Sequence, residues 1–309
     1  MNGLFRIGTR ASPLALVQAR SVADGLRARW PTLVFDLVPI VTEGDERAKK
    51  FPDESPDFKR AFTRRLEEAL LTGRIDAAVH SLKDMPATFP EGLVLGAVPP
   101  REVPFDAFVS RDGRPFAELP ERARVGTSSL RRIAQLRAAR PEVHTAALDG
   151  NVDTRLRKLD ASNYDAVVLA AAGLRRLGLA RRITELFPAE VMVPAIGQGA
   201  LAVEIRTDDS LARDVVATVN DPSSRAEAQA ELTVARALGV GCNLPAGALG
   251  RANGANLRLT ALLATPDGRR VIRASAAGAT ADPEGVGKAA VAEMLQKGAR
   301  EILGEAVAG

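Results

Sequence analysis

Hydroxyl and guanidinium side chains are concentrated in Thr127-Ser128-Ser129-Leu130-Arg131-Arg132, which follows an apolar strand and begins a helical pattern. The first N–H groups of a helix have no partner within the helix, so N–H groups, hydroxyls and guanidiniums together could bind a carboxylate or phosphate. The alternative is a helix N-cap followed by two solvated arginines. A similar turn, Thr9-Arg10-Ala11-Ser12, precedes the helix that starts at Pro13. The repetition favours anion binding at both turns.

Asp84 follows a buried-type strand and stands beside Lys83. A neighbouring cation favours an ionised carboxylate, which could stabilise a developing positive charge or transfer protons. The alternative is an ordinary carboxylate in a surface turn. His80 and His144 are the only histidines, which leaves little room for a histidine-based metal site or catalytic triad. We expect His80 to pack or form a hydrogen bond at the end of its strand.

The single cysteine, Cys242, lies in the loop-forming stretch Gly239-Val240-Gly241-Cys242-Asn243-Leu244-Pro245. Its thiol could be a packing residue, a nucleophile or the anchor of a covalent group. An isolated free cysteine is most often inert packing, so this loop alone does not indicate chemistry.

The elements that position these side chains follow one order twice: strand, Gly-Thr turn, Ser-capped helix, strand, helix and strand. The first copy is expected over residues 4–7, 8–11, 12–30, 33–38, 62–73 and 75–79. The second copy is expected over residues 124–125, 126–129, 130–140, 143–148, 152–159 and 164–169. This alternation predicts two α/β domains built on parallel sheets with right-handed crossovers.

Two such domains, joined by residues 98–108 and 193–202, would face each other across a cleft. Ligands of open α/β sheets bind beyond the carboxyl ends of the strands, where the candidate side chains fall. A helix over 225–238 then leads to Cys242, and strands over 257–263 and 270–274 flank the turn Pro266-Asp267-Gly268. The remainder is therefore a smaller α+β domain.

Composition narrows the class of protein. The 309 residues are 46% hydrophobic and 26% charged, which is typical of a soluble protein of two or three domains. One cysteine excludes an intramolecular disulfide and fits a reducing cytoplasm. We expect no membrane partner, because there is neither an apolar signal segment nor a stretch of ~20 apolar residues. Aromatic residues are 4% and net charge is +4, so a small anion is a better ligand than nucleic acid.

Several long motifs occur in one order along almost the whole chain. They are Arg6 to Ala15, Ala78 to Pro86, Val125 to Arg132, Gly150 to Val152 with Thr154 to Leu156, Ala172 to Gly178, Pro194 to Ala200, and Gly241-Cys242. In this combination the sequence resembles the porphobilinogen deaminase (hydroxymethylbilane synthase) family. The resemblance implies head-to-tail condensation of four molecules of the substrate porphobilinogen into hydroxymethylbilane, with release of four ammonia molecules, in tetrapyrrole biosynthesis.

The resemblance also implies a cytoplasmic monomer with two domains arranged like a type II periplasmic binding protein and a third α+β domain. The corresponding bounds are residues 1–101 with 196–219, residues 102–195, and residues 220–309. It further implies a dipyrromethane cofactor, made from two substrate units and attached to Cys242 by a thioether, from which the chain of pyrroles grows. No metal is implied.

The family's functional residues map onto this sequence position by position. Asp84 matches the catalytic carboxylate, which also contacts the cofactor. The other positions that match cofactor-binding residues are Cys242, Lys83, Ser129, Arg131 and Arg132. The positions that match substrate-binding residues are Arg10, Ser12, Thr127, Arg155, Arg176, Lys59, Phe62 and Gln198. Arginine is suited to this task because it binds carboxylates in a bidentate manner.

Three departures from the family pattern concern the same cleft. The usual Gly-Gly-Lys-Gly-Leu-Phe run is Pro56 to Phe62 here, without its glycines. Asp149 stands where an arginine is usual, and Asp153 replaces a glycine. Either Arg157 or Lys158 compensates, or cofactor assembly and elongation are weakened. An impaired oligopyrrole- or anion-binding protein of the same fold is therefore the main alternative, ahead of an unrelated two-lobed binding module or a thiol hydrolase.

Overall fold

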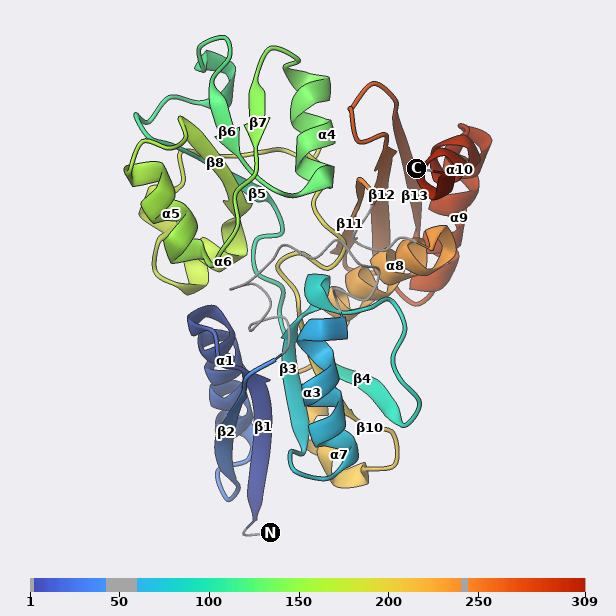
Figure 1. Ribbon diagram of the computed structural model, residues 1–309. Coiled ribbons are helices and arrows are strands. Elements are labelled where there is room, and N and C mark those ends of the chain that lie inside the picture. Colours follow the sequence, from blue (N-terminus) through green and yellow to red (C-terminus); the bar gives the residue numbers. More distant parts are fainter. Residues whose placement is uncertain (1–2, 43–59, 240–243, 309) are drawn as a thin grey trace.

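The computed structural model describes residues 3–42, 60–239 and 244–308, which form three lobes, each with its own sheet (Figure 1). The N-terminal lobe has a five-stranded sheet in the order β2-β1-β3-β10-β4. Its strands are β1 (Leu4–Arg10), β2 (Val34–Ile40), β3 (Ala77–Ser81), β4 (Leu93–Ala97) and β10 (Leu201–Arg206). Its helices are α1 (Pro13–Arg29), α3 (Arg60–Leu71), α7 (Ser210–Ala217) and the 3-10 turn η1 (Leu82–Asp84).

The predicted parallel pairing is correct for part of this sheet. Strand β1 runs parallel to both β2 and β3, but β10 is antiparallel to β3 and β4. Residue Leu201, where the chain returns from the middle lobe, pairs with Ser81 at the end of β3. Because β10 enters the sheet at the edge where β3 ends, it has to run in the opposite direction.

The middle lobe repeats this arrangement, with the order β7-β6-β8-β5-β9. Its strands are β5 (Asp106–Ser110), β6 (Arg124–Gly126), β7 (His144–Ala146), β8 (Ala166–Ala170) and β9 (Glu185–Leu186). Its helical segments are η2 (Phe116–Glu118), α4 (Leu130–Ala139), α5 (Val152–Asp160), α6 (Ala171–Arg176) and η3 (Ala180–Arg182). Strand β6 is parallel to β7 and β8, and β5 is antiparallel to β8. The predicted repeat is confirmed, with the same antiparallel exception.

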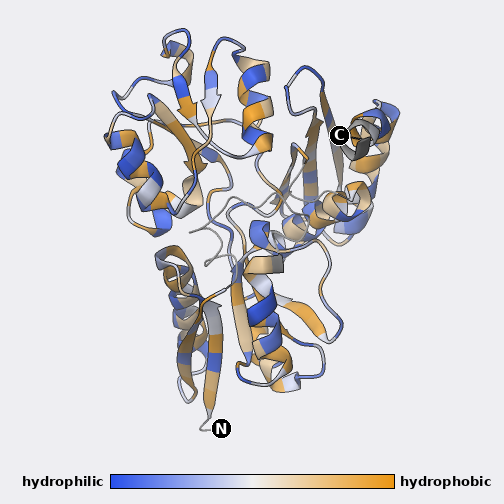
Figure 2. Ribbon diagram, in the orientation of Figure 1, coloured by the Kyte–Doolittle hydropathy of each residue, from blue (hydrophilic) through white to orange (hydrophobic). Residues whose placement is uncertain are grey.

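Apolar side chains fill the space between each sheet and its helices. Figure 2 shows β8 in the orange of hydrophobic residues, and four of its five residues are buried. Phe108, Phe116 and Phe187 form a cluster under the middle sheet, with ring centroids 5.2–5.6 Å apart and largely edge-on geometry. Such aromatic pairs stabilise a core beyond the area they bury.

The C-terminal lobe packs helices on a three-stranded antiparallel sheet. It contains α8 (Pro222–Leu238), β11 (Ala246–Asn253), β12 (Asn256–Ala264), β13 (Val271–Ala279), α9 (Pro283–Gln296) and α10 (Ala299–Ala308). Asp221 caps α8 by accepting a hydrogen bond from the Ser224 amide, and Gly239 ends the helix at a φ of 60°. The predicted α+β organisation and the hairpin between β12 and β13 are both confirmed.

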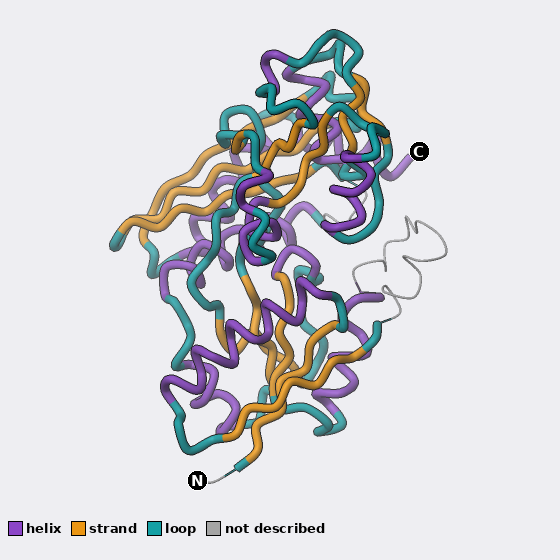
Figure 3. Tube along the Cα trace, turned by 90° about the vertical axis from the view of Figure 1, so that its left-hand side faces the viewer, coloured by secondary structure: helices purple, strands orange, loops and turns teal. Residues whose placement is uncertain are grey.

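Two linkers cross between the N-terminal and middle lobes and touch one another. The Glu102 amide donates to the Gly199 carbonyl, and a Cβ on Gly199, whose φ is 86°, would lie 2.3 Å from the Glu102 oxygen. Arg101 joins the linkers to α8, since it donates to the Gln198 carbonyl and to Glu231 at 2.9 and 2.6 Å. In Figure 3 the N-terminal lobe is at the bottom and the other two lobes overlap above it.

Within the described residues, no helix combines the length and the apolar character needed to cross a membrane.

Candidate active site

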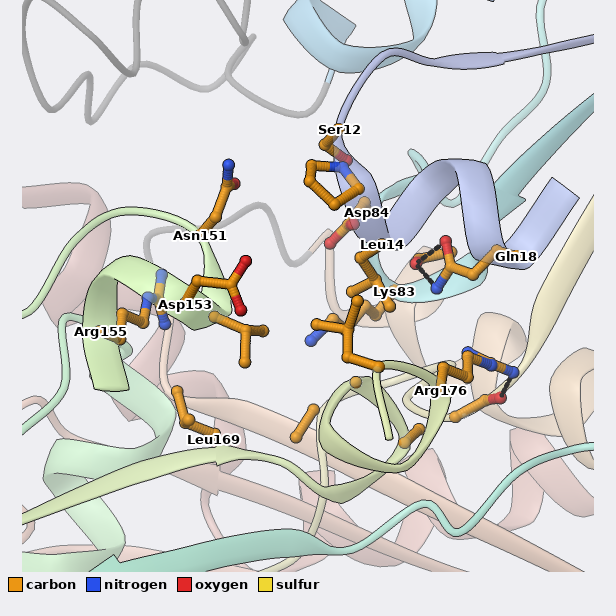
Figure 4. A pocket seen from close by; sticks show the side chains of 18 of the residues that line it. Ser12, Leu14, Gln18, Lys83, Asp84, Asn151, Asp153, Arg155, Leu169 and Arg176 are labelled. Atoms are coloured by element: carbon orange, nitrogen blue, oxygen red, sulfur yellow. Dashed lines mark hydrogen bonds between the residues drawn. The ribbon is translucent and has the colours of Figure 1, made fainter. Parts of the chain in front are cut away.

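A cavity of about 230 Å³ lies between the N-terminal and middle lobes, at the ends of their parallel strands (Figure 4). We call it the cleft. Seven of the candidate catalytic and binding residues line it: Arg10, Ser12, Lys83, Asp84, Arg132, Arg155 and Arg176. The convergence of both repeats on one cleft is therefore confirmed for these side chains.

The wall from the N-terminal lobe begins at the end of β1. A turn was predicted for Thr9 and Arg10, but both residues belong to strand β1. The buried Thr9 hydroxyl donates to the Ala15 carbonyl. Ser12 caps α1 by accepting from the Ala15 amide at 3.3 Å, as predicted. The guanidinium of Arg10 lies 4.2 Å from the ring centroid of Phe62, which is favourable for a cation over an aromatic face.

Asp84 and Lys83 follow β3 in the turn η1, and both line the cleft. Burial lowers the pKa of Lys83 to about 8, although the charge of Asp84 opposes this shift. On the preceding strand, the buried His80 ring is 3.0 Å from the Glu204 carboxylate, so His80 hydrogen-bonds at its strand end as expected. The His80 contact helps to fix the end of β3, and η1 then places Lys83 and Asp84 next to each other at the cleft.

The wall from the middle lobe contains a buried charge cluster at the start of α4. Arg131 and Arg132 both bind Asp106 of β5, at 2.9 and 2.8 Å, and donate in addition to the carbonyls of Val193 and Val168. Burial alone would raise the pKa of Asp106, but the two guanidiniums hold it at about 2. For the cation Arg132, burial has the opposite effect and lowers the pKa to about 10. Arg132 reaches the cleft, whereas Arg131 is not among its lining residues.

The hydroxyls of the preceding turn bind the middle lobe's own backbone. The Thr127 hydroxyl accepts from the Ser129 amide, and the Ser128 hydroxyl accepts from the Leu148 amide at 2.9 Å. Ser129 is the N-cap of α4, yet its side chain makes no capping hydrogen bond, contrary to the predicted Ser cap. The three residues are not part of the cleft lining.

Arg155 and Arg176 line the cleft while bound to main-chain oxygens. Arg155 donates to the Gly150 carbonyl at 2.7 Å, and Arg176 donates to the Gly199 carbonyl at 2.8 Å. Burial lowers the pKa of each, opposed at Arg155 by Asp149 and Asp84. A guanidinium has five N–H donors, so each retains donors for a carboxylate.

Gln18 is a lining residue that the sequence did not reveal. Its amide donates to the Ser81 hydroxyl at 2.9 Å, and this contact joins α1 to the end of β3. Its position one helical turn after Leu14, which also lines the cleft, was the available signal. Asp153 was noted as a departure from the family pattern and also lines the cleft.

Asp149 lies outside the cleft lining and is exposed. Lys158 donates to its backbone carbonyl at 3.1 Å, whereas Arg157 donates to the Thr154 hydroxyl. The predicted compensation for the Asp149 charge by Arg157 or Lys158 is therefore limited to the contact of Lys158 with the Asp149 backbone. The negative charge of Asp149 instead favours the charged form of Arg155, because it opposes the fall in the Arg155 pKa that burial causes.

Gln198 is buried away from the cleft lining and donates to the Pro104 carbonyl at 2.7 Å, so it joins the two linkers. Cys242 and Lys59 lie outside the described residues.

The sequence matches two family models over most of its length. Residues 5–214 match the model described as porphobilinogen deaminase, dipyromethane cofactor binding domain, and residues 226–296 match the model of the porphobilinogen deaminase C-terminal domain. A porphobilinogen deaminase of Desulforudis audaxviator is 48% identical over 303 residues, which are 98% of both chains. One of Moorella thermoacetica is 46% identical and covers 97% of this chain and 96% of its own.

Solved structures give more distant and partial likenesses. The methionine binding protein MetQ covers 74% of this chain and 94% of its own at 14% identity, with a TM-score of 0.44. The BenM effector binding domain with its effector benzoate covers 71% and 91% at 12% identity, with a TM-score of 0.43.

Proposed function

Because the chain belongs to the porphobilinogen deaminase family, we propose that the cleft is where it condenses porphobilinogen. The enzyme is a transferase of tetrapyrrole biosynthesis: four porphobilinogen molecules are joined head to tail into hydroxymethylbilane, and four ammonia molecules are released. The observation that carries the assignment to this cleft is Asp84, which lies among five cationic lining residues, Arg10, Lys83, Arg132, Arg155 and Arg176.

Asp84 is the proposed catalytic residue. An ionised carboxylate beside the reacting pyrrole stabilises the positive charge that develops as ammonia leaves and as the new carbon–carbon bond forms. Lys83 is directly adjacent to Asp84, and the Asp84 charge opposes the fall in the Lys83 pKa that burial causes. Arg155 lies close enough to Asp84 for the two charges to stabilise each other across the cleft.

The cations of the cleft bind carboxylates in this proposal. Each porphobilinogen has an acetate and a propionate group, so a growing chain needs many cationic donors in one cavity. The substrate-binding residues would be Arg10, Ser12, Thr127, Arg155, Arg176, Lys59, Phe62 and Gln198. Gln198 and Thr127 are buried outside the lining, so their part is to position the linkers and the middle wall.

The cleft fits a dipyrromethane cofactor, which brings the carboxylates and rings of two substrate units. Cations line it together with the apolar side chains of Leu14, Val152, Leu169 and Leu177. When bound, the cofactor supplies the primer to which substrate units are added. Lys83, Ser129, Arg131, Arg132 and Asp84 are the residues proposed to hold it, with Arg131 acting through Asp106, which it shares with Arg132.

Cys242 is the proposed attachment residue, through a thioether. It follows α8, which ends at Leu238 and is bound through Glu231 to Arg101 of a linker between the two cleft lobes. The domain bounds proposed are residues 1–101 with 196–219, residues 102–195, and residues 220–309. We propose that the enzyme acts as a cytoplasmic monomer, which light scattering of the purified protein would test.

The intact mass of the purified protein tests the cofactor assignment. The wild-type mass is expected to exceed the sequence mass by one dipyrromethane unit, and Cys242→Ser should remove the excess. A wild-type protein that stays unmodified after porphobilinogen is supplied would contradict the assignment. Ammonia release then measures turnover, and a modified protein that releases no ammonia would support the alternative of an impaired oligopyrrole-binding protein.

A further inference from the structure

Asp153 places a carboxylate on the middle wall of the cleft. It is in the first turn of α5, two residues after the N-cap Asn151, and it lines the cavity. Figure 4 shows its side chain directed away from Arg155 and toward the opposite wall, which carries Asp84, Leu14 and Lys83. The cleft therefore presents one carboxylate from each lobe, Asp84 from the N-terminal lobe and Asp153 from the middle lobe.

Within the described part of the chain, the Asp153 carboxylate makes no hydrogen bond or ion pair, although five cations line the same cavity. Three of these cations are bound to other oxygens: Arg132 to Asp106, Arg155 to the Gly150 carbonyl, and Arg176 to the Gly199 carbonyl. The carboxylate is thus available to a cation that a ligand brings into the cleft.

The substrate brings such a cation. Porphobilinogen carries an aminomethyl group beside its two carboxylates, and an alkylamine of this kind is protonated at neutral pH. Each condensation expels the amine as ammonia, so the units already joined retain only their carboxylates. An ammonium group is therefore what distinguishes an incoming monomer from the chain of pyrroles already in the cleft.

We propose that Asp153 binds the ammonium group of the incoming porphobilinogen and favours this monomer over amine-free pyrroles. The inference deepens the proposed function of the cleft and rests on it. A carboxylate at the first turn of a helix also stabilises the helix dipole, and it repels the substrate's carboxylates. Neither effect discriminates between a pyrrole with an amine and one without it, so discrimination is the property to measure.

Two unreactive ligands isolate this property. Both are pyrroles with the acetate and propionate groups; one ends in an aminoethyl group, whose extra methylene prevents expulsion of ammonia, and the other ends in a methyl group. Calorimetric titration of the cofactor-loaded enzyme gives the ratio of their affinities. We expect Asp153→Asn to lower the preference for the amine roughly three- to tenfold, the size of one partly solvated charge contact.

Two further variants serve as controls. Asp153→Glu should keep the preference, because it keeps the charge. Asp160→Asn removes a carboxylate from the other end of the same helix, where it pairs with Arg182 at 2.6 Å outside the cleft lining, and should leave the ratio unchanged. An unchanged ratio in Asp153→Asn, or equal tightening of both ligands, would overturn the inference. Ammonia release by the wild-type enzyme, measured separately, tests the proposed function itself.

Discussion

The two walls of the cleft are built by the same succession of strand, turn and helix, but they use their arginines differently. On the N-terminal wall, Arg10 precedes the capped helix, lies at the end of β1 and reaches the cavity beside Phe62. On the middle wall, Arg131 and Arg132 lie inside the first turn of α4 and bind the buried Asp106.

The difference shows how a partner far along the chain decides the role of a cation. Asp106 is on β5, which enters the middle sheet next to β8 and under the start of α4. A buried carboxylate at that position requires compensating charge, and two guanidiniums supply it. The middle wall therefore joins ligand binding to the stability of its lobe, because Arg132 both lines the cleft and binds the buried Asp106.

The largest effect is expected from removing the carboxylate of the N-terminal wall. Asp84→Asn keeps the shape and removes the charge that stabilises the developing cation, so the rate of ammonia release should fall by about 10²–10⁴-fold. The rate is to be measured per mole of cofactor-loaded protein, with the loaded fraction read from the intact mass. If more than a tenth of the wild-type rate remains, Asp84 is not the catalytic carboxylate.

Removing the carboxylate of the middle wall should instead affect stability. Asp106→Asn leaves two buried guanidiniums without a counter-charge and should lower the free energy of unfolding by about 3–5 kcal/mol, measured by urea denaturation. The pKa of Asp106 is lowered to about 2, so its stabilising contribution is present above about pH 4 and is lost as the pH falls from about 4 to 2. The variant should lack this part of the acid dependence, and a wild-type acid profile in Asp106→Asn would contradict the assignment.

A pair of arginine variants tests the contrast between the walls directly. Arg10→Gln should raise KM roughly tenfold, because a charged contact to a substrate carboxylate is lost, with little change in stability. Arg131→Gln should lower the urea midpoint and change KM much less. If both variants behave alike in the two measurements, the distinction between an arginine that lines the cleft and an arginine that stabilises the lobe is wrong.

A smaller effect is expected from the pH dependence of Lys83. Since burial lowers its pKa to about 8, the cation is lost as the pH rises through that value. The affinity for an amine-free pyrrole dicarboxylate should fall roughly threefold between about pH 7 and 9. Lys83→Arg keeps its charge over this range and should remove the fall. A fall of equal size in Lys83→Arg would assign the effect to another group.

The smallest effect is expected at Asp149. Asp149→Arg should leave the rate of ammonia release unchanged or raise it, because the residue lies outside the cleft lining. A clear loss would indicate that the carboxylate is needed to stabilise the charge of Arg155. Asp149→Asn distinguishes a missing negative charge from an added positive one.

Local features of the structure could be predicted from the sequence, since they depend on neighbours along the chain. Ser12 before Pro13 predicts the helix cap that is observed, and the position of Asp84 after an apolar strand predicts its place at the cleft. The family resemblance supplied the activity and cofactor, which composition and periodicity alone could not.

Long-range contacts could not be predicted in the same way. Nothing near Arg131 signals that Asp106, 25 residues earlier, will bury its guanidinium. Strand β10 was not predicted, since residues 193–202 were expected to be a linker, and its direction follows from where the chain returns from the middle lobe. Apolar alternation identifies a strand but does not give its direction in the sheet.

The return of the chain at β10 has a consequence for how the protein is made. Strand β10 lies between β3 and β4, so the N-terminal sheet lacks an inner strand until residues 201–206 have left the ribosome. All strands of the middle sheet lie within residues 106–186 and are synthesised earlier. Domains generally fold as units during synthesis, and the first sheet that can be completed is therefore the second one in the sequence. The N-terminal sheet stays incomplete, with β4 unpaired, until a strand more than a hundred residues later in the sequence has been synthesised.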